Sequence, residues 1–526
     1  MPFPPEASLS GIGVRNFMPT VRYSRTFRHD RIAPGGRVLL HFGAVDFEAS
    51  AWLNGRYLGN HIGGYTPFTF EITDEILPGE NLLLVEVRDD NRTGVQPAGK
   101  QSRKPESHGC MYTRVTGIWQ TVWLEDVGRS FVDGVTVGMP GSGRNIWAIV
   151  DLGGRPAGNV EIEVSRDGNV VGRGRSPATR NTKVPLEIET PVLWNPLDPN
   201  LYDATITLSS NGGVLDRVES YFGLRSVSIR GNSFLVNGER VFQRLVLDQG
   251  YYPDGIYTAP TDQDLKRDIE VSIEMGFNGA RLHQKVFEPR FLYWADQLGY
   301  LVWGEYPSWG IDMANPDACD NLMSEWSEVV RRDVNHPSII GWCPFNETPV
   351  DQNESLVRAV YELTKRLDPG RPVIDTSGYT HVVTDVYDSH DYDQDPERFA
   401  ERHRSIMENG IPYQNHPHQD VEYAGQPVMV SEFGGTWWNP GQIGRDDWGY
   451  GERPVTGEDF LERYGALVGA LLGNPGIAGF CYTQLYDIEQ EVNGLCTYNR
   501  EAKFDPAVFR EVNSRRAAYE EYPGGD

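Results

Sequence analysis

The sequence predicts a multidomain protein in which two β-sandwiches precede a C-terminal (β/α)8 barrel. Its 526 residues are enough for about three domains of ordinary size. Up to about residue 225, short β-rich runs are separated by Gly, Asn and Pro, which is typical of sandwiches. Beyond that point strand-like runs alternate with amphipathic helical stretches, which is typical of α/β folds.

The first domain, residues 1–127, is predicted to be a jelly-roll-like β-sandwich. Asn54-Gly55 lies between two apolar runs and is a strong signal for a hairpin turn. No helical period interrupts this region, and its predicted strands lie near 38–42, 51–58, 66–72 and 82–87.

The second domain, residues 128–225, continues in the same style. Its β-rich runs include 145–150, 160–164 and 201–208. About a hundred residues with this many strands predict an immunoglobulin-like sandwich.

The third domain, residues 226–526, is predicted to be the barrel. Six helices are expected at 261–275, 289–298, 320–334, 354–367, 395–408 and 457–472. Eight strands are expected near 240–247, 277–283, 300–305, 338–346, 371–375, 384–388, 426–432 and 477–484. An open doubly wound sheet is the alternative, but no Gly-rich phosphate turn follows the first strand.

Composition excludes several classes of protein. The net charge is 48 − 74 = −26 and no Lys/Arg run occurs, so nucleic-acid binding is not expected. No apolar stretch approaches the ~18 residues of a membrane span, so no membrane partner is expected. The five cysteines lack CxxC spacing, so neither a disulfide framework nor a zinc site is predicted.

Polar side chains follow most of the predicted barrel strands, at the end where a barrel carries its active site. Three of them are glutamates at the ends of apolar strand runs, and a carboxylate there is costly to desolvate unless it has partners or a chemical role. Several tryptophans occur in the same loops, and flat apolar rings beside carboxylates suit a sugar. Because serine-hydrolase, zinc-protease and nucleotide-binding motifs are absent, hydrolysis of a glycosidic bond by paired carboxylates is the leading hypothesis. These strand-end residues are Asp248, Arg281, His283, Glu305, Asn346, Glu347, Asp388, His390, Glu432 and Gln484.

Two segments carry a family resemblance. Residues 333–347 (DVNHPSIIGWCPFNE) closely resemble the acid/base signature of glycoside hydrolase family 2, and residues 428–434 (VMVSEFG) resemble its nucleophile segment. Further segments match in the correct order, so the resemblance covers nearly the whole chain. It implies a sugar-binding sandwich, an immunoglobulin-like sandwich and a catalytic barrel. The further segments are 193–202, 276–283, 293–305 and 479–494.

The resemblance also implies roles for individual residues. Glu347 is the expected general acid and base, Glu432 the expected nucleophile, and Asn346 a donor to the sugar 2-hydroxyl. A partly apolar site beside Trp342 and Phe345 is expected to raise the pKa of Glu347. Neither a metal nor another cofactor is expected. The other predicted substrate-binding residues are Arg281, His283, Glu305, Asp388, His390, Trp437, Trp438 and Gln484.

These features predict a retaining exo-glycosidase that acts on a neutral glycone, with a β-galactoside first. Family glucuronidases read the sugar carboxylate with an Asn-x-Lys pair near the barrel mouth, whereas the only such pair here is Asn181-Thr-Lys183 in the second sandwich. An α-L-arabinofuranosidase, a β-galactofuranosidase and a catalytically silent carbohydrate-binding protein are the alternatives. The expected partner is a carbohydrate, and a homo-oligomer is left open. No signal peptide is visible, so a cytoplasmic location is expected, with export of a chain that lacks its signal as the alternative.

Overall fold

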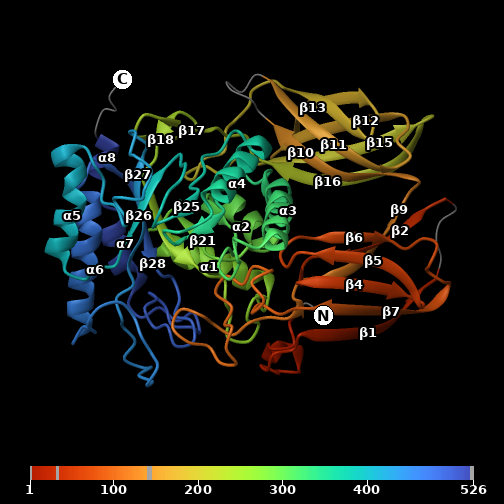
Figure 1. Cartoon of the computed structure of the whole chain (residues 1–526). Coiled ribbons are helices and arrows are strands. Elements are labelled where there is room, and N and C mark those ends of the chain that lie inside the picture. Colours follow the sequence, from red (N-terminus) through yellow and green to blue (C-terminus); the bar gives the residue numbers. More distant parts are fainter. Residues whose placement is uncertain (1–2, 31–34, 139–144, 522–526) are drawn as a thin grey trace.

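A computed structural model describes residues 3–30, 35–138 and 145–521 of the chain. It contains two β-sandwiches on one side of a parallel barrel (Figure 1), which confirms the predicted fold class. Neighbouring barrel strands pair in parallel, whereas the sandwich strands pair in antiparallel.

The first sandwich consists of a four-stranded and a three-stranded sheet. The predicted turn is present, because Asn54 and Gly55 both have positive φ, at 53° and 82°, and join two paired strands. Buried Leu40, Phe42 and Val85 help to form the core between the sheets. In spatial order the sheets are β1 (Thr20–His29), β7 (Gly79–Arg88), β4 (Glu48–Leu53) and β5 (Arg56–Ile62), and β6 (Phe68–Glu71), β2 (Arg37–Phe42) and β9 (Val122–Val127). Two short strands, β3 (Val45–Asp46) and β8 (Gly117–Ile118), pair separately, and a 3-10 helix covers Ser8–Ser10.

The second sandwich has alternating burial along its strands, because one face of each strand packs into the core and the other meets solvent. Its core includes Val160, Ile162, Val164 and Ile206, all at 2% exposure or less. In spatial order its strands are β10 (Ser130–Gly138), β11 (Ile146–Gly154), β14 (Asn181–Ile188), β13 (Asn169–Pro177), β12 (Asn159–Arg166), β15 (Tyr202–Ser210) and β16 (Gly213–Phe222).

The barrel strands follow the predicted order with one displaced element. The fifth strand was expected over 371–375 but is β25 (Thr376–Ser377), beside β24 (Phe345–Asn346). An isolated bridge joins Val373 to Trp342 through the Pro372 carbonyl and the Ile374 amide, while the amide and carbonyl of Val373 bond to Asp385. The remaining strands are β20 (Gln243–Asp248), β21 (Gly279–Leu282), β22 (Leu301–Glu305), β23 (Ile339–Cys343), β26 (Tyr387–Asp391), β27 (Val428–Gly434) and β28 (Ile477–Thr483).

Helices surround these strands and begin at clear sequence signals. Thr261 and Thr456 each form a capping box with an Asp three residues later. The six predicted helices are α1 (Asp262–Glu274), α2 (Pro289–Leu298), α3 (Pro316–Asp333), α4 (Glu354–Leu367), α5 (Pro396–Asn409) and α6 (Gly457–Leu472). Elements that were not predicted are α7 (Pro506–Asn513), α8 (Ala518–Glu521) and a small sheet of β17 (Val227–Arg230), β18 (Ser233–Val236) and β19 (Glu239–Arg240).

A loop of the first sandwich, residues 89–116, lies against the barrel, and we call it the sandwich loop (Figure 1). The amides of Ala98 and Gly99 both donate to the carbonyl of Trp309 in the loop after β22. Gln490, after β28, donates to the carbonyl of Met111 at 3.1 Å. The first sandwich therefore contributes directly to the mouth of the barrel.

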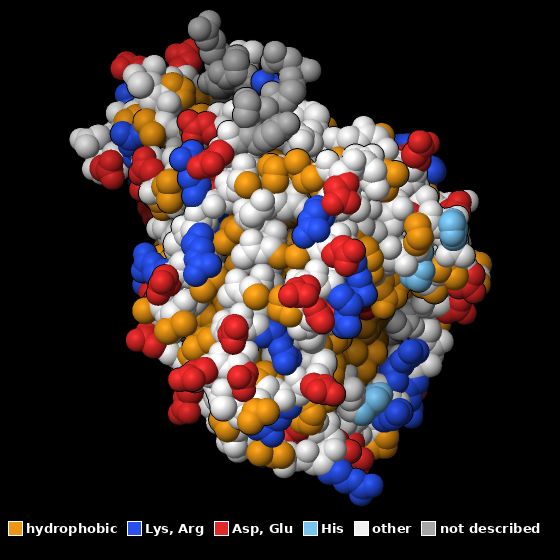
Figure 2. Space-filling model, turned by 90° about the vertical axis from the view of Figure 1, so that its left-hand side faces the viewer, with side chains coloured by type: hydrophobic (Ala, Val, Ile, Leu, Met, Phe, Trp, Pro, Cys, Tyr) orange, Lys and Arg blue, Asp and Glu red, His pale blue; other side chains and the backbone are white. Residues whose placement is uncertain are grey.

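Charged side chains of both signs lie on the surface. Figure 2 shows acidic and basic side chains interspersed over one face of the molecule. Within residues 3–30, 35–138 and 145–521, no helix is long and apolar enough to cross a bilayer.

Candidate active site

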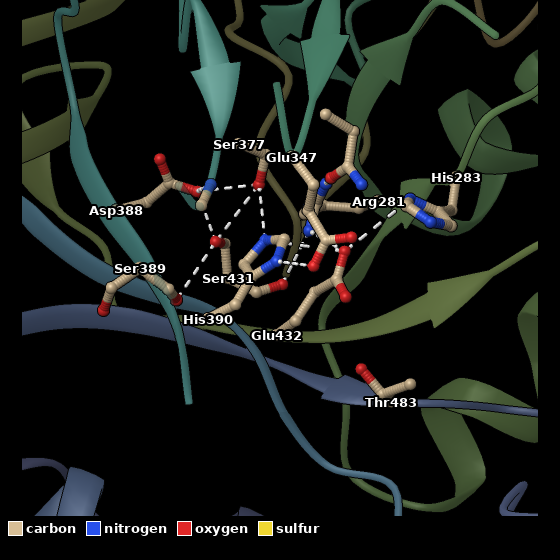
Figure 3. Close-up of polar contacts among 12 residues, drawn as sticks. Arg281, His283, Glu347, Ser377, Asp388, Ser389, His390, Ser431, Glu432 and Thr483 are labelled. Atoms are coloured by element: carbon tan, nitrogen blue, oxygen red, sulfur yellow. Dashed lines mark hydrogen bonds and ion pairs between the residues drawn. The ribbon is translucent and has the colours of Figure 1, made fainter. Parts of the chain in front are cut away.

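Two glutamates face each other at the carboxyl ends of the barrel strands. Glu347 directly follows β24, and Glu432 lies within β27. Figure 3 shows their carboxylates side by side with His390, and one donor atom from each of these three residues lies within 4.8 Å of the others. Such a set has the ligand types for a cation, but it also brings two carboxylates to the separation that a double displacement requires.

Glu432 is held by two donors on opposite oxygens. The Arg281 guanidinium lies 3.2 Å from its Oε1, and the Tyr392 hydroxyl donates to its Oε2. Arg281 is fully buried and is fixed by a second hydrogen bond, of 2.7 Å, to the carbonyl of Ser431. Hydrogen bonding of this kind favours the ionised carboxylate and fixes its direction.

Glu347 has a different environment from the one expected. Its Oε1 lies 2.8 Å from Nδ1 of His390. Burial raises the pKa of Glu347, but His390, Lys100 and Arg281 outweigh burial, so the pKa lies below its ordinary value. The predicted rise is wrong because these charged neighbours outweigh burial. Trp342 is not part of the site, since its indole packs against Trp326 and donates to Asp368.

His390 carries the complementary shift. Burial lowers its pKa, but Glu432 and Glu347 outweigh burial and raise it above the ordinary value. Its Nε2 lies 3.1 Å from the Ser377 hydroxyl. The two shifts have opposite directions, as expected for a carboxylate and an imidazole that stabilise each other's charged forms.

Two predicted sugar-binding residues have buried polar atoms without a hydrogen-bond partner among the described residues. They are Nδ2 of Asn346 and Nε2 of His283. The other end of each side chain is fixed: Asn346 Oδ1 accepts from Arg281 at 3.1 Å, and His283 Nδ1 lies 3.0 Å from Glu305. An oriented but unpaired buried polar atom is costly unless a ligand satisfies it.

Three other predicted site residues lie behind the side chains described so far. Glu305 contacts Arg281 at 2.5 Å and accepts from the amide of Gln284, so its oxygens are occupied. Asp388 accepts from Ser377 and Ser431 and lies 3.1 Å from His381. Gln484 is fully buried; it accepts a hydrogen bond from Gln249 and donates one to Asn493. These side chains position their neighbours rather than present free atoms to a sugar.

The two tryptophans that were predicted to bind sugar, Trp437 and Trp438, have different surroundings. Trp437, on the loop after β27, is half-buried and its Nε1 has no partner among the residues that the structure describes. Trp438 packs between Phe460 and Phe504 in the barrel core, with ring centroids 6.1 Å from each. Its apolar packing makes Trp438 a core residue, which corrects the expectation of a sugar contact.

Sequence reasoning missed three residues that lie at the site. Tyr392 follows His390 by two positions, a spacing that keeps it on the same side of an extended segment and could have indicated it. Glu491 and Lys100 gave no such signal, since they come from the loop after β28 and from the first sandwich. Burial lowers the pKa of Lys100, but Cys110 and the carboxylates of Glu491, Glu432 and Glu347 outweigh burial and raise it.

A cavity of about 580 Å³ opens beside Glu347. Its wall includes Asn346 and Glu347 but not Glu432, so it lies on the Glu347 side of the carboxylate pair. Apolar side chains from the sandwich loop and from the loop after β22 line it, namely Met111, Trp309, Ile311 and Met313. A cavity of this composition suits the group that leaves when a glycosidic bond breaks.

Family models match most of the chain. The sugar-binding domain model of glycosyl hydrolases family 2 covers residues 7–124, a second model of the family covers 154–225, and its TIM barrel domain covers 227–464. The order of the three models is the order of the three domains described above.

Curated relatives carry two different names. A β-glucuronidase of Paenibacillus borealis is 27% identical over 408 aligned residues, covering 71% of this chain and 67% of that protein. A β-galactosidase of Thermoanaerobacter pseudethanolicus is 27% identical over 391 residues, covering 70% of this chain and 50% of that protein. Against a putative β-glucuronidase of Formosa agariphila the match spans 43% of the relative's length.

Solved structures share the fold. The β-glucuronidase of Bifidobacterium dentium, complexed with coumarin-3-O-glucuronide, has a TM-score of 0.80 at 21% identity and covers 97% of this chain and 91% of that chain. A β-galacturonidase of Eisenbergiella tayi bound to galacturonate has a TM-score of 0.77 at 20% identity, covering 98% and 92%.

Proposed function

The chain belongs to glycoside hydrolase family 2, and we propose that it is an exo-glycosidase that hydrolyses β-glycosidic bonds with retention of configuration. The observation that carries this proposal is the placement of Glu347 and Glu432, whose facing oxygens lie within 4.8 Å. Retaining enzymes need carboxyl groups about 5–5.5 Å apart, whereas inverting enzymes leave room for a water at about 6.5–9.5 Å.

The reaction proceeds in two displacements. In the first, an oxygen of Glu432 attacks the anomeric carbon, the bond to the leaving oxygen breaks, and the leaving oxygen takes a proton from Glu347. The proton reaches Glu347 from His390, to which it is hydrogen-bonded. In the second, Glu347 takes a proton from water as the water attacks the same carbon and releases Glu432. Asn346 Nδ2 is placed to donate to the 2-hydroxyl.

We propose a neutral glycone, with a β-galactoside first. The Asn-x-Lys pair of Asn181 and Lys183 lies in β14 of the second sandwich, and Lys183 packs over Trp147 there. The barrel mouth is acidic, since Glu491 adds a third carboxylate to the two glutamates. A β-glucuronide is the second candidate, because several relatives carry that name and because the buried cation Lys100 lies at the site.

The catalytic roles are tested by removing each carboxylate. Glu432→Ala should lower kcat by several orders of magnitude, because no glycosyl-enzyme forms, and azide should restore turnover and give a glycosyl azide of inverted configuration. Glu347→Ala should affect substrates with poor leaving groups far more than activated aryl glycosides. Wild-type rates in Glu432→Ala, or equal losses across a leaving-group series in Glu347→Ala, would contradict the assignments.

The glycone is tested by kcat/KM across nitrophenyl glycosides. The panel holds β-galactopyranoside, β-mannoside, β-glucuronide, β-galactofuranoside and α-L-arabinofuranoside. The proposal expects a neutral sugar to lead, and a glucuronide preferred over every neutral member would replace it with the second candidate. Sugar binding without turnover of any member would favour the catalytically silent alternative.

A further inference from the structure

Lys100 is a buried cation at the barrel mouth that the reaction described above does not use. Its side chain comes from the sandwich loop, is 7% exposed, and lies 4.0 Å over the ring of Trp309. Among the residues that the structure describes, its Nζ forms neither an ion pair nor a hydrogen bond. Burying an ammonium group is costly unless its donors are satisfied, so this position calls for an acceptor.

A second buried charged group, of opposite sign to Lys100, is the carboxylate of Glu491. It is 2% exposed and belongs to the loop after β28. Its Oε2 accepts from the Tyr112 hydroxyl at 2.6 Å, and its Oε1 accepts from Asn493 at 3.0 Å. Lys100 and Glu491 interact electrostatically with each other and with Glu432, yet they form no direct ion pair.

The two charges are held in place from both domains. The amide of Tyr112 donates to the carbonyl of Lys100 at 2.7 Å, so the residue that fixes Lys100 also binds Glu491. Trp309, under the ammonium, donates from its indole to the carbonyl of Asn346 at 2.9 Å. Lys100 is thus tied through Trp309 to the segment that carries Glu347.

We propose that Lys100 and Glu491 form a specificity-determining pair that grips hydroxyl groups of a neutral glycone, with Lys100 donating and Glu491 accepting. This inference rests on the proposed function, because it places the sugar between these charges and the catalytic glutamates. Lys100 is supplied by the first sandwich, so that domain selects the sugar while the barrel performs the chemistry.

A neutral sugar fits this arrangement better than a uronic acid. A hydroxyl both accepts and donates, so neighbouring hydroxyls satisfy an ammonium and a carboxylate together. A sugar carboxylate would satisfy Lys100 but would also meet Glu491, Glu432 and Glu347 in a poorly solvated site, where like charges repel strongly.

The test measures sugar binding by calorimetry, which does not depend on turnover. Galactose, mannose and L-arabinose are the neutral probes, and galacturonate and glucuronate are the anionic ones. Lys100→Met and Glu491→Gln are compared with wild type and with the matched controls Lys104→Met and Glu106→Gln, which alter exposed residues of the same loop. Circular dichroism melting checks that each variant folds.

If Lys100 and Glu491 select the sugar, the neutral sugar that binds best should bind wild type more tightly than either uronate. Lys100→Met and Glu491→Gln should each weaken that binding about 10- to 150-fold, the range for hydrogen bonds to charged groups, while the controls stay within about twofold. Tighter binding of a uronate that is lost in Lys100→Met, or unchanged neutral binding in both variants, would overturn the pair. Normal sugar selection without hydrolysis would instead overturn the proposed function and leave the pair intact.

Discussion

In the proposed reaction, the proton that Glu347 delivers depends on His390. At 2.8 Å the imidazole stabilises the Glu347 carboxylate, and the carboxylates of Glu432 and Glu347 stabilise the imidazolium. Two such groups titrate as a pair. The proposed reaction needs the form with one proton, which is lost as the pH rises through the raised pKa of the histidine. The fall of kcat/KM at high pH is therefore expected to follow the titration of the Glu347–His390 pair, and not that of an isolated glutamic acid.

Replacing His390 with Asn should shift the high-pH fall of kcat/KM to lower pH. Above the raised pKa the wild-type pair loses its proton and kcat/KM falls with increasing pH. In His390→Asn, Glu347 must hold the proton alone, so the basic limb should shift to lower pH and kcat should fall about 10²- to 10⁴-fold. The measurement is a pH profile of kcat/KM, with His29→Asn on the first sandwich as control. An unchanged basic limb would show that His390 does not share the proton.

The residue scale also shows where sequence reasoning stops. Glu347 and Glu432 follow apolar strand runs, so position alone predicts that they share the barrel mouth. Trp438 satisfies the same rule yet packs against Phe504, because adjacent loop residues point in opposite directions. Lys100 lies far from the barrel in sequence, so no spacing rule connects it to Glu432.

At the scale of elements, regular patterns were predictable and local hydrogen bonding was not. The helices α2, α4 and α6 have the predicted bounds, because each begins at a cap or a Pro and has a clear apolar face. The strand expected over 371–375 is reduced to an isolated bridge between Val373 and Trp342, and both backbone groups of Val373 bond to Asp385. A single side-chain competitor of this kind leaves no periodic signal.

The sandwich loop depends on one close approach. Gly99 has a φ of +54°, and a Cβ there would lie 2.3 Å from the carbonyl oxygen of Gln284, which is backbone and cannot move aside cheaply. Glycine at this position lets the loop lie against the segment that follows His283.

Gly99→Ala should therefore displace the segment that carries Lys100. We expect the free energy of unfolding to fall by about 1–3 kcal/mol and the KM for the preferred glycoside to rise more than kcat falls. Gly109→Ala is the matched control, because Gly109 has a similar φ of +53° but no atom within 4 Å of the added Cβ. Urea unfolding and steady-state kinetics measure both effects. Equal effects in the two variants would attribute the loss to backbone strain alone and contradict a role for the contact.

At the scale of the whole molecule, the first sandwich and the barrel share one buried interface. Trp119 comes from the sandwich and is fully buried. Its indole donates to the carbonyl of Gly64 at 2.8 Å, and its ring packs edge-on against Tyr257 of the barrel with centroids 5.4 Å apart. The Thr258 hydroxyl donates to its carbonyl at 2.5 Å. The two domains therefore stabilise each other, and the proposed glycone site, which takes residues from both, depends on that contact.

Trp119→Ala should destabilise both domains together. Removing a buried tryptophan leaves a cavity and costs about 3–5 kcal/mol, and here the cavity faces both the sandwich and the barrel. Urea unfolding followed by circular dichroism and by activity should then show one shifted transition in both signals, because separation of the domains removes Lys100 from the mouth of the barrel. Trp123→Ala is the matched control: Trp123 is 43% exposed on β9, so its loss should cost about 1 kcal/mol or less. If activity persisted in Trp119→Ala while the sandwich unfolded separately, the barrel alone would suffice for the site, and a glycone subsite shared between domains would be excluded.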